Sequence, residues 1–211
     1  VRVGLGCVVG LGLIGESIGL AMKRSKISNQ IIGFARSNST LKRAIELGLV
    51  DKVKDNLEDA VNDCDLIILA TPLSTFKKLV EEMSPFLKKD CIITDTGSAK
   101  LSVIEDLRGI LPNNVEFIPG HPIAGTEESG PDAGFAELFD NRWCILTPTE
   151  ENSSNAIGLI KEFWESIGSK VEIMDPLHHD KVLAITSHIP HLIALNIVGT
   201  ANNLANVTEK E

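Results

Sequence analysis

The sequence lacks cysteine pairs, a positive net charge and a long apolar segment. None of its four cysteines forms a C-x-x-C pair, which argues against zinc and favours the reducing cytoplasm. The net charge of −9 over 211 residues argues against nucleic acid as a partner. No run approaches the roughly eighteen apolar residues of a membrane span. We therefore expect a soluble, cytoplasmic protein that binds neither nucleic acid nor membrane, and no signal peptide, because a glycine motif occupies its place.

That glycine motif is Gly10-Leu11-Gly12-Leu13-Ile14-Gly15, which follows the apolar residues 7–9 at the G-x-G-x-x-G spacing. In such motifs the first glycine makes a tight turn and the second lets a pyrophosphate approach the backbone. The third lets the helix pack closely on the strand. The helix N-terminus then faces the phosphates with its free N–H groups. The motif predicts dinucleotide binding; the alternative is an ordinary strand–turn–helix.

An acidic residue is missing where an NAD site uses one. Such sites have Asp or Glu at the end of the second strand, roughly twenty residues past the last glycine. No acidic residue occurs between Glu16 and Glu46, and Arg36 and Ser37 follow the strand expected at residues 30–35. An arginine can bind the 2′-phosphate of NADP through charge-assisted hydrogen bonds. NADP is therefore preferred over NAD; the alternative is a solvated arginine in a protein that still accepts NAD.

Strand and helix patterns alternate over residues 1–174. Further strands are expected at residues 65–70, 91–94, 115–118, 143–147 and 170–174. The alternation predicts an α/β fold with a doubly wound parallel sheet of the Rossmann type. Ligands bind such sheets beyond the carboxyl ends of the strands, so Thr71-Pro72 and Ser98 should share one edge with Arg36 and the glycine motif. Thr71 and Ser98 could equally be plain turn or cap residues.

Residues 175–211 show no strand pattern and begin a second, helical domain. Two helices are expected, at residues 177–187 and 190–205. Two helices are too few to bury a core, so we expect a fragment or a chain completed by another subunit. The uncovered side chains should form an apolar patch of Leu192, Ile193, Ile197 and Val198.

One histidine in the first domain stands in an unusual setting. His121 lies within Pro119-Gly120-His121-Pro122-Ile123-Ala124-Gly125, after the strand expected at residues 115–118. Two prolines and two glycines predict a fixed loop there, and an imidazole at a strand's carboxyl end suits acid–base chemistry. The alternative is a surface histidine without a role. The histidines after residue 175 predict no metal site, because Pro190 interrupts their helical spacing.

Several motifs together resemble the prephenate/arogenate (cyclohexadienyl) dehydrogenases of tyrosine biosynthesis. They are the glycine motif, Asp95-Thr96-Gly97-Ser98-Ala99-Lys100, Gly120-His121-Pro122-Ile123-Ala124-Gly125-Thr126-Glu127-Glu128-Ser129-Gly130, His179-Asp180 and Ser187-His188-Ile189-Pro190-His191. The resemblance implies a Rossmann domain followed by the start of an all-α dimerisation domain, and a homodimer. It also implies oxidative decarboxylation of prephenate or arogenate. A hydride leaves the ring carbon that bears the hydroxyl for the nicotinamide, CO₂ departs and the ring becomes aromatic.

The resemblance further implies a role for each site residue. His121 would hydrogen-bond the substrate hydroxyl and take up its proton, and Ser98 would orient either this histidine or the hydroxyl. Thr126 and His188 would line the substrate pocket, and Glu127 would lie near its mouth.

Some features depart from the family pattern. The family's arginine for a substrate carboxylate follows the S-H-x-P-H element, but no arginine occurs after Arg142, and the dimer helices lie mostly beyond Glu211. Glu16 is larger and more acidic than a residue expected beside a pyrophosphate. Two other functions remain: a Rossmann dehydrogenase of the hydroxyacid type, which would leave the His121 segment unexplained, and a non-catalytic NADP-binding module.

Overall fold

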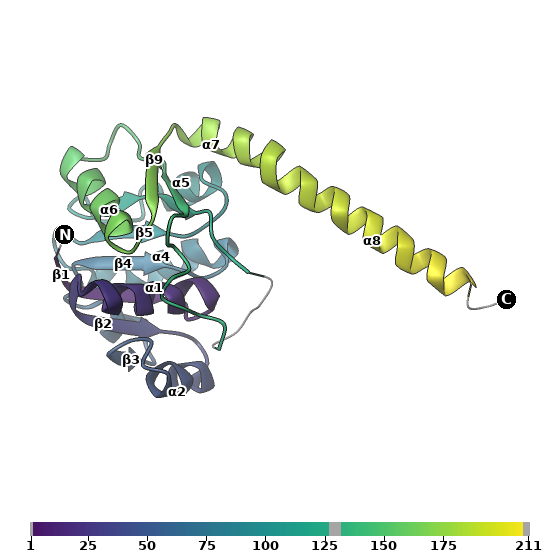
Figure 1. The fold of residues 1–211 in the computed structure, drawn as a ribbon. Helices are drawn as coiled ribbons and strands as arrows, with labels where there is room; N and C mark the ends of the chain where they lie inside the picture. The colour runs from purple at the N-terminus through teal and green to yellow at the C-terminus, as the bar shows by residue number, and fades with distance from the viewer. Residues whose placement is uncertain (1, 127–131, 209–211) are drawn as a thin grey trace.

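The computed structural model describes residues 2–126 and 132–208, with side chains to residue 202. A six-stranded parallel sheet forms its centre, in the order β3-β2-β1-β4-β5-β6 (Figure 1). The strands are β1 (Val3–Val9), β2 (Ser28–Phe34), β3 (Lys52–Lys54), β4 (Leu66–Leu69), β5 (Ile92–Asp95) and β6 (Glu116–Ile118). This order is that of the doubly wound dinucleotide-binding fold, so the predicted fold class is confirmed.

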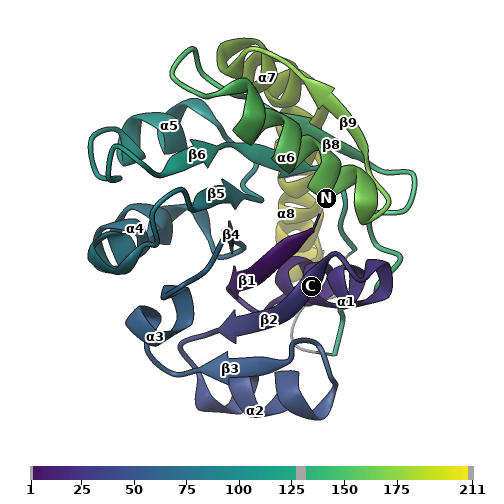
Figure 2. The ribbon, with the colours of Figure 1, turned by 90° about the vertical axis from the view of Figure 1, so that its left-hand side faces the viewer.

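Helices cover both faces of this sheet. They are α1 (Leu13–Ser25), α2 (Asn38–Glu46), α3 (Leu57–Val61), α4 (Phe76–Met83), α5 (Leu101–Leu107) and α6 (Ser154–Ser166), with 3₁₀ turns η1 (Leu73–Thr75) and η2 (Ser84–Phe86). Figure 2 shows α1 and α6 on one side of the sheet and α4 and α5 on the other. Alternate strand residues face the two cores, because side chains in a strand point to opposite faces. Val8 and Ile68 pack in one cluster, whereas Cys7 and Ile67 pack in the other.

A second, three-stranded sheet was not predicted. It consists of β7 (Gly120–Pro122), β8 (Trp143–Leu146) and β9 (Lys170–Ile173), with β7 antiparallel to β8 and β8 parallel to β9. The expectation of a loop around His121 is therefore wrong, because His121 lies on β7 opposite Ile145. The pairing begins at Pro119, whose carbonyl accepts a hydrogen bond of 2.9 Å from the Thr147 N–H. It joins segments distant in the sequence, so local patterns do not reveal it.

The C-terminal part is one continuous helix rather than the two helices expected. It runs through α7 (Pro176–Leu183), the π-helical turn η3 (Ala184–His188) and α8 (Ile189–Thr208), and it projects from the body of the molecule (Figure 1). The expected break at Pro190 is absent. A π-helical turn directly precedes this proline, and in it the Ile189 N–H donates to the Ala184 carbonyl, five residues back.

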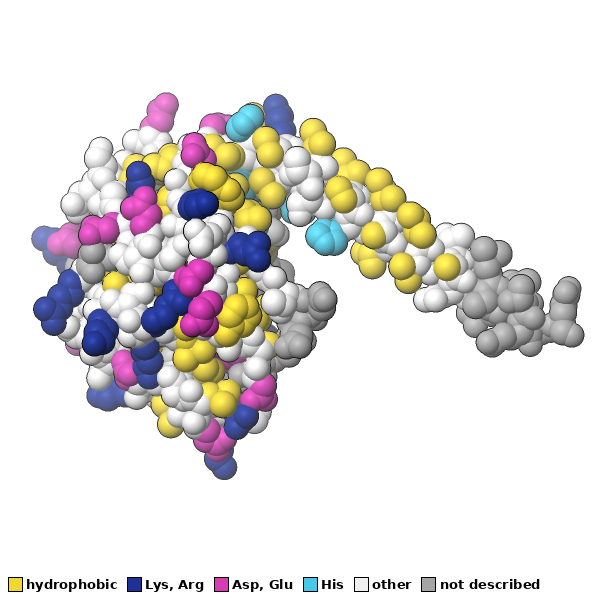
Figure 3. Space-filling view, in the orientation of Figure 1, with side chains coloured by type: hydrophobic (Ala, Val, Ile, Leu, Met, Phe, Trp, Pro, Cys, Tyr) yellow, Lys and Arg dark blue, Asp and Glu magenta, His cyan; other side chains and the backbone are white. Residues whose placement is uncertain are grey.

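This helix presents apolar side chains to solvent. The predicted patch is present, since Leu192, Ile193, Ile197 and Val198 are between 54% and 64% exposed, and Figure 3 shows apolar side chains along α8. The expectation of no span-like segment is wrong, because Pro176–Asn202 has the length and composition of a membrane span, with a mean hydropathy of 1.6. The prediction missed this segment because two helices separated near Pro190 were expected in place of one. Core helices of soluble proteins meet the same criterion, but they are mostly buried, whereas 6% of the span-like window is buried here.

Candidate active site

The glycine motif forms the tight turn that its spacing predicts. Gly10 has φ of +103°, and its N–H donates to the Phe34 carbonyl at 2.8 Å. A Cβ at Gly15 would lie 1.9 Å from the Gly10 oxygen, whereas a Cβ at Gly12 would meet nothing within 4 Å. Gly15 therefore allows the close packing of α1 on the turn, and the space at Gly12 is open for a phosphate to approach the backbone.

Glu16 lies inside the protein instead of beside this open space. It is fully buried, and a Cβ added at Gly134 would lie 2.6 Å from the Glu16 Cβ. The segment that starts at Asp132 crosses α1 here, and the Phe135 N–H donates to the Ser17 hydroxyl at 3.1 Å. Burial and the nearby Asp132 carboxylate raise the pKa of Glu16 to about 7. The acidic residue that directly follows the motif is thus covered by this segment.

The other predicted cofactor residues lie where neighbouring strands end. Arg36 and Ser37 are exposed directly after β2, and the Ser37 and Ser39 hydroxyls are 2.5 Å apart. Thr71, followed by Pro72, comes after β4, and its hydroxyl lies 2.8 Å from that of Thr75. β2 and β4 pair with β1 on its two sides in parallel, so these residues lie on the same edge as the glycine turn.

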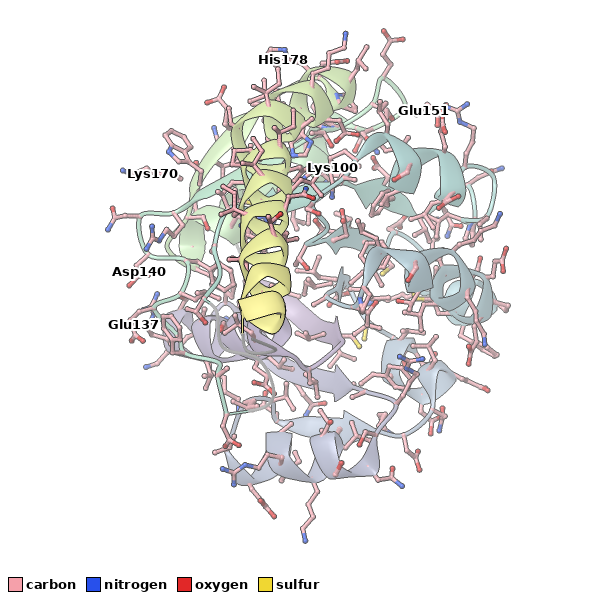
Figure 4. The ribbon with its side chains drawn as sticks, turned by 90° about the vertical axis from the view of Figure 1, so that its right-hand side faces the viewer. Lys100, Glu137, Asp140, Glu151, Lys170 and His178 are labelled. Atoms are coloured by element: carbon pink, nitrogen blue, oxygen red, sulfur yellow. The ribbon has the colours of Figure 1, made fainter. Side chains whose placement is uncertain are left out.

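A buried ion pair joins the end of β5 to β7. Lys100 Nζ lies 2.6 Å from Asp95 Oδ2 and donates to the Gly120 carbonyl at 2.6 Å. Asp95 also accepts hydrogen bonds from the Gly120 N–H at 3.0 Å and the Gly97 N–H at 2.8 Å. Both charged side chains are fully buried, and Figure 4 shows Lys100 beside the start of the C-terminal helix. The pair fixes the backbone of Gly120, the neighbour of His121.

Asp180 ties α7 to the start of α5. Its Oδ1 accepts the Lys100 N–H at 2.9 Å and its Oδ2 accepts the Leu101 N–H at 3.0 Å. Burial raises the pKa of Asp180, but the hydrogen bonds from Leu101, His179 and Lys100 outweigh it and lower the pKa below its ordinary value. Asp180 is therefore an anion at neutral pH.

Two imidazoles connect His121 to this carboxylate. His121 Nδ1 lies 2.9 Å from His179 Nε2, and His179 Nδ1 lies 2.8 Å from Asp180 Oδ1. His121 is 9% exposed and His179 is fully buried. Burial, the Lys100 charge and the neighbouring His179 and His188 lower the pKa of His121 to about 3. His121 is consequently neutral at physiological pH and can accept a proton.

Ser98, Thr126 and His188, the other predicted site residues that the structure describes, come from three different parts of the chain. Ser98 is exposed after β5. The side chain that hydrogen-bonds the His121 ring at Nδ1 is His179, not Ser98. Thr126 is exposed near the end of the first described segment, Glu127 lies outside the described residues, and His188 is half-buried on η3. Among the described residues, no group of three potential ligands could hold a metal ion.

Sequence reasoning assigned no role to the four residues that support His121. His179 and Asp180 are hydrogen-bonded in series to its ring, and Asp95 and Lys100 bind the backbone of its neighbour Gly120. All four lie in motifs that carry the family resemblance, but the contacts of His179 and Asp180 join α7 to β7 and α5, far apart in sequence. The spacing of Asp95 and Lys100 across a strand–helix turn was the one local signal for the ion pair.

We predict that Lys100→Met destabilises the protein by about 3–5 kcal/mol, because it leaves the Asp95 carboxylate buried without its partner. Urea unfolding of the variant and the wild type measures the loss. Lys161→Met is the matched control, since it removes a half-exposed pair with Glu165 at 3.9 Å and should change the free energy of unfolding by less than about 0.5 kcal/mol. Equal effects of the two substitutions would refute the structural role of the buried pair.

Comparison with known families gives two matches along the chain. The model of the prephenate dehydrogenase nucleotide-binding domain matches residues 18–173, and that of the prephenate dehydrogenase dimerization domain matches residues 175–211. Together they extend over most of the chain.

Individual relatives agree with these matches. A cyclohexadienyl dehydrogenase of Zymomonas mobilis is 45% identical over 91% of this chain, and a prephenate dehydrogenase of Bacillus subtilis is 33% identical over 95%. The chain spans 65% and 54% of the lengths of these two relatives.

Solved structures show the same fold. The prephenate dehydrogenase of Aquifex aeolicus, in complex with hydroxyphenyl propionate and NAD⁺, has a TM-score of 0.88 and 33% identity, with 95% of this chain and 70% of that chain covered. The arogenate dehydrogenase of Synechocystis has a TM-score of 0.82 and 32% identity, with 95% and 74% covered.

Proposed function

The chain belongs to the prephenate dehydrogenase family, and we propose that it carries out the oxidative decarboxylation of prephenate, arogenate or both, with NADP as the preferred cofactor. The observation that carries the proposal is a buried, neutral histidine, His121. Its neighbour Gly120 is bonded to Asp95 at the carboxyl end of β5, the edge of the main sheet that also carries the glycine turn. The hydroxyacid-type alternative leaves this histidine and its hydrogen-bonded partners without a purpose. We also propose a cytoplasmic location, because all four cysteines are free and buried.

His121 would act as the general base. The carbon that loses the hydride bears a hydroxyl, and this oxygen must give up its proton as the carbon–hydrogen bond breaks. When bound, the nicotinamide accepts the hydride. His121 would hold the hydroxyl proton at Nε2, and the electron pair released from the breaking C–CO₂ bond would complete the aromatic ring. The proton can then return to the resulting phenolate oxygen.

Substrate contacts would come from both domains. Ser98 is exposed at the end of β5 and would hydrogen-bond the substrate hydroxyl, while Thr126 follows β7 and His188 lies on η3. The charge of His188 contributes to the lowered pKa of His121, which supports a role for His188 near the reacting atoms. We propose that Thr126, Glu127 and His188 line the substrate pocket.

Turnover of prephenate and arogenate, followed by the absorbance of reduced cofactor with NADP and NAD, tests the function of the complete protein. We expect turnover of at least one substrate, coupled to release of CO₂. Reduction with simple hydroxyacids but neither cyclohexadiene would favour the hydroxyacid type. Cofactor binding without any turnover would favour a non-catalytic module.

We predict that His121→Asn lowers kcat by roughly 10²–10⁴-fold, the contribution of a general base, and leaves the KM for the cofactor nearly unchanged. The variant should also lose the acidic limb of the pH–rate profile, because the base is active only when unprotonated. Steady-state kinetics at pH 7 measure kcat and KM, and a pH–rate profile extended down to about pH 3 measures the acidic limb, because the pKa of His121 lies at about 3. A His121→Asn enzyme with near-wild-type kcat, beside an inactive His188→Asn enzyme, would assign the base to His188.

We predict that Arg36→Asp weakens binding of NADP and shifts the preference toward NAD, because it replaces a phosphate ligand with a ribose acceptor. The ratio of kcat/KM for the two cofactors is the measurement. Arg2→Asp is a charge-matched control at the other end of the sheet, beside Asn29 at the start of β2. An unchanged ratio in Arg36→Asp would show that Arg36 does not select the cofactor.

We propose that the exposed apolar face of α8 forms a homodimer interface, and we predict a dimer in sedimentation experiments on the complete protein. Ile193→Asp with Ile197→Asp, one helical turn apart, should shift the protein to a monomer. Ile45→Asp, at a 45% exposed apolar residue on α2, should leave the dimer intact. A wild-type monomer at micromolar concentration, with Ile193 and Ile197 protected from solvent, would contradict the proposal.

A further inference from the structure

We propose that His179 is a positioning residue that, together with Asp180, fixes the tautomer of His121 and leaves Nε2 of His121 free to accept the substrate's proton. The inference rests on the proposed function for its catalytic meaning, but the tautomer itself is a property of the protein without substrate. It assigns a role to a buried histidine that the proposed mechanism does not otherwise use.

The assignment starts at Asp180. Its two oxygens accept backbone N–H groups from Lys100 and Leu101, and a carboxylate can only accept hydrogen bonds. His179 Nδ1, which lies 2.8 Å from Oδ1, must therefore carry a proton. A neutral imidazole has one N–H, so Nε2 of His179 is an acceptor.

The protonation of His179 in turn determines which nitrogen of His121 carries the proton. The short contact of 2.9 Å between His179 Nε2 and His121 Nδ1 requires a proton on one of the two atoms, and His179 has none to give there. His121 Nδ1 is therefore the donor, and its Nε2 holds a lone pair. The opposite tautomer of His179 would place an unprotonated Nδ1 against the Asp180 carboxylate, so two acceptors would face each other.

The charges around the two rings agree with this arrangement. Lys100 and His188 disfavour a positive charge on His121, whereas Asp180 favours one. Asp95, the other nearby carboxylate, is bound to Lys100 and to backbone N–H groups. When His121 takes up the proton, its charge is linked to Asp180 through the fully buried ring of His179. The pair thus orients the base and stabilises its charged form.

The tautomers can be measured directly in the complete protein without substrate, from the ¹⁵N chemical shifts of the imidazole nitrogens. The chain has five histidines, so single substitutions can assign each signal. At neutral pH we expect protons on Nδ1 of both His121 and His179, and bare Nε2 atoms. A proton on Nε2 of His121 would overturn the proposal, whether or not the protein proves to be a dehydrogenase.

Two substitutions then separate positioning from packing. His179→Phe keeps a ring of similar size without nitrogens and should lower kcat by roughly 10²-fold, with little change in the KM for the cofactor, while the fixed tautomer of His121 is lost. His179→Gln offers an amide oxygen to His121 Nδ1 and should recover part of the rate. His178→Phe, at the exposed neighbour on α7 (Figure 4), should leave kcat unchanged.

Two results would contradict the inference. If His179→Phe lowered the melting temperature but kept both kcat and the His121 tautomer, His179 would have a packing role only. If His178→Phe were as damaging as His179→Phe, the effect would belong to α7 as a whole. By contrast, a wild-type protein with the expected tautomers but no turnover would reject the proposed function and retain the tautomer assignment.

Discussion

The position of His121 depends on the buried ion pair of Lys100 and Asp95, because this pair connects β5, α5 and β7. Asp95 ends β5 and Lys100 precedes α5. On β7, Lys100 donates a hydrogen bond to the Gly120 carbonyl and Asp95 accepts one from the Gly120 N–H. A buried charge that loses its partner costs several kcal/mol of stability. Any shift of β7 would break the hydrogen bonds between Gly120 and this ion pair, so the pair holds β7 in place. His121 follows Gly120 directly, and its ring is thereby fixed between the main sheet and α7.

The same pair creates an electrostatic conflict that the surrounding residues resolve. Lys100 disfavours protonation of His121, and burial acts in the same direction, which keeps the imidazole neutral and able to act as a base. A base must nevertheless carry a positive charge once it has accepted a proton. Asp180 supplies the compensating charge through His179, and it is itself held by the backbone at the start of α5.

The sequence allowed prediction of the features that depend on neighbouring residues. The glycine turn, the strands β1, β2, β4, β5 and β6, and the edge shared by Arg36 and Thr71 follow from local spacing and apolar patterns. The short strand β3 was missed, and the predicted strands at residues 143–147 and 170–174 lie in the second sheet instead of the main one. Pairing of distant segments was not predictable in this way. Residues 120–122 form the strand β7 because they pair with β8, which is more than twenty residues away in the sequence. The contact between His179 and His121 also depends on Asp180, which binds the backbone at the start of α5. Likewise, the continuous helix depends on a π turn, which has no simple sequence signature.

The central claim is that His121 receives the proton of the substrate hydroxyl, on the edge where the nicotinamide binds. A crystal structure of the complete protein with NADP and the aromatic product, 4-hydroxyphenylpyruvate, tests it most directly. The account predicts the phenol oxygen within about 3 Å of His121 Nε2, with His179 on the opposite nitrogen. A phenol oxygen bound to His188 instead, with His121 facing away from the ring, would contradict it.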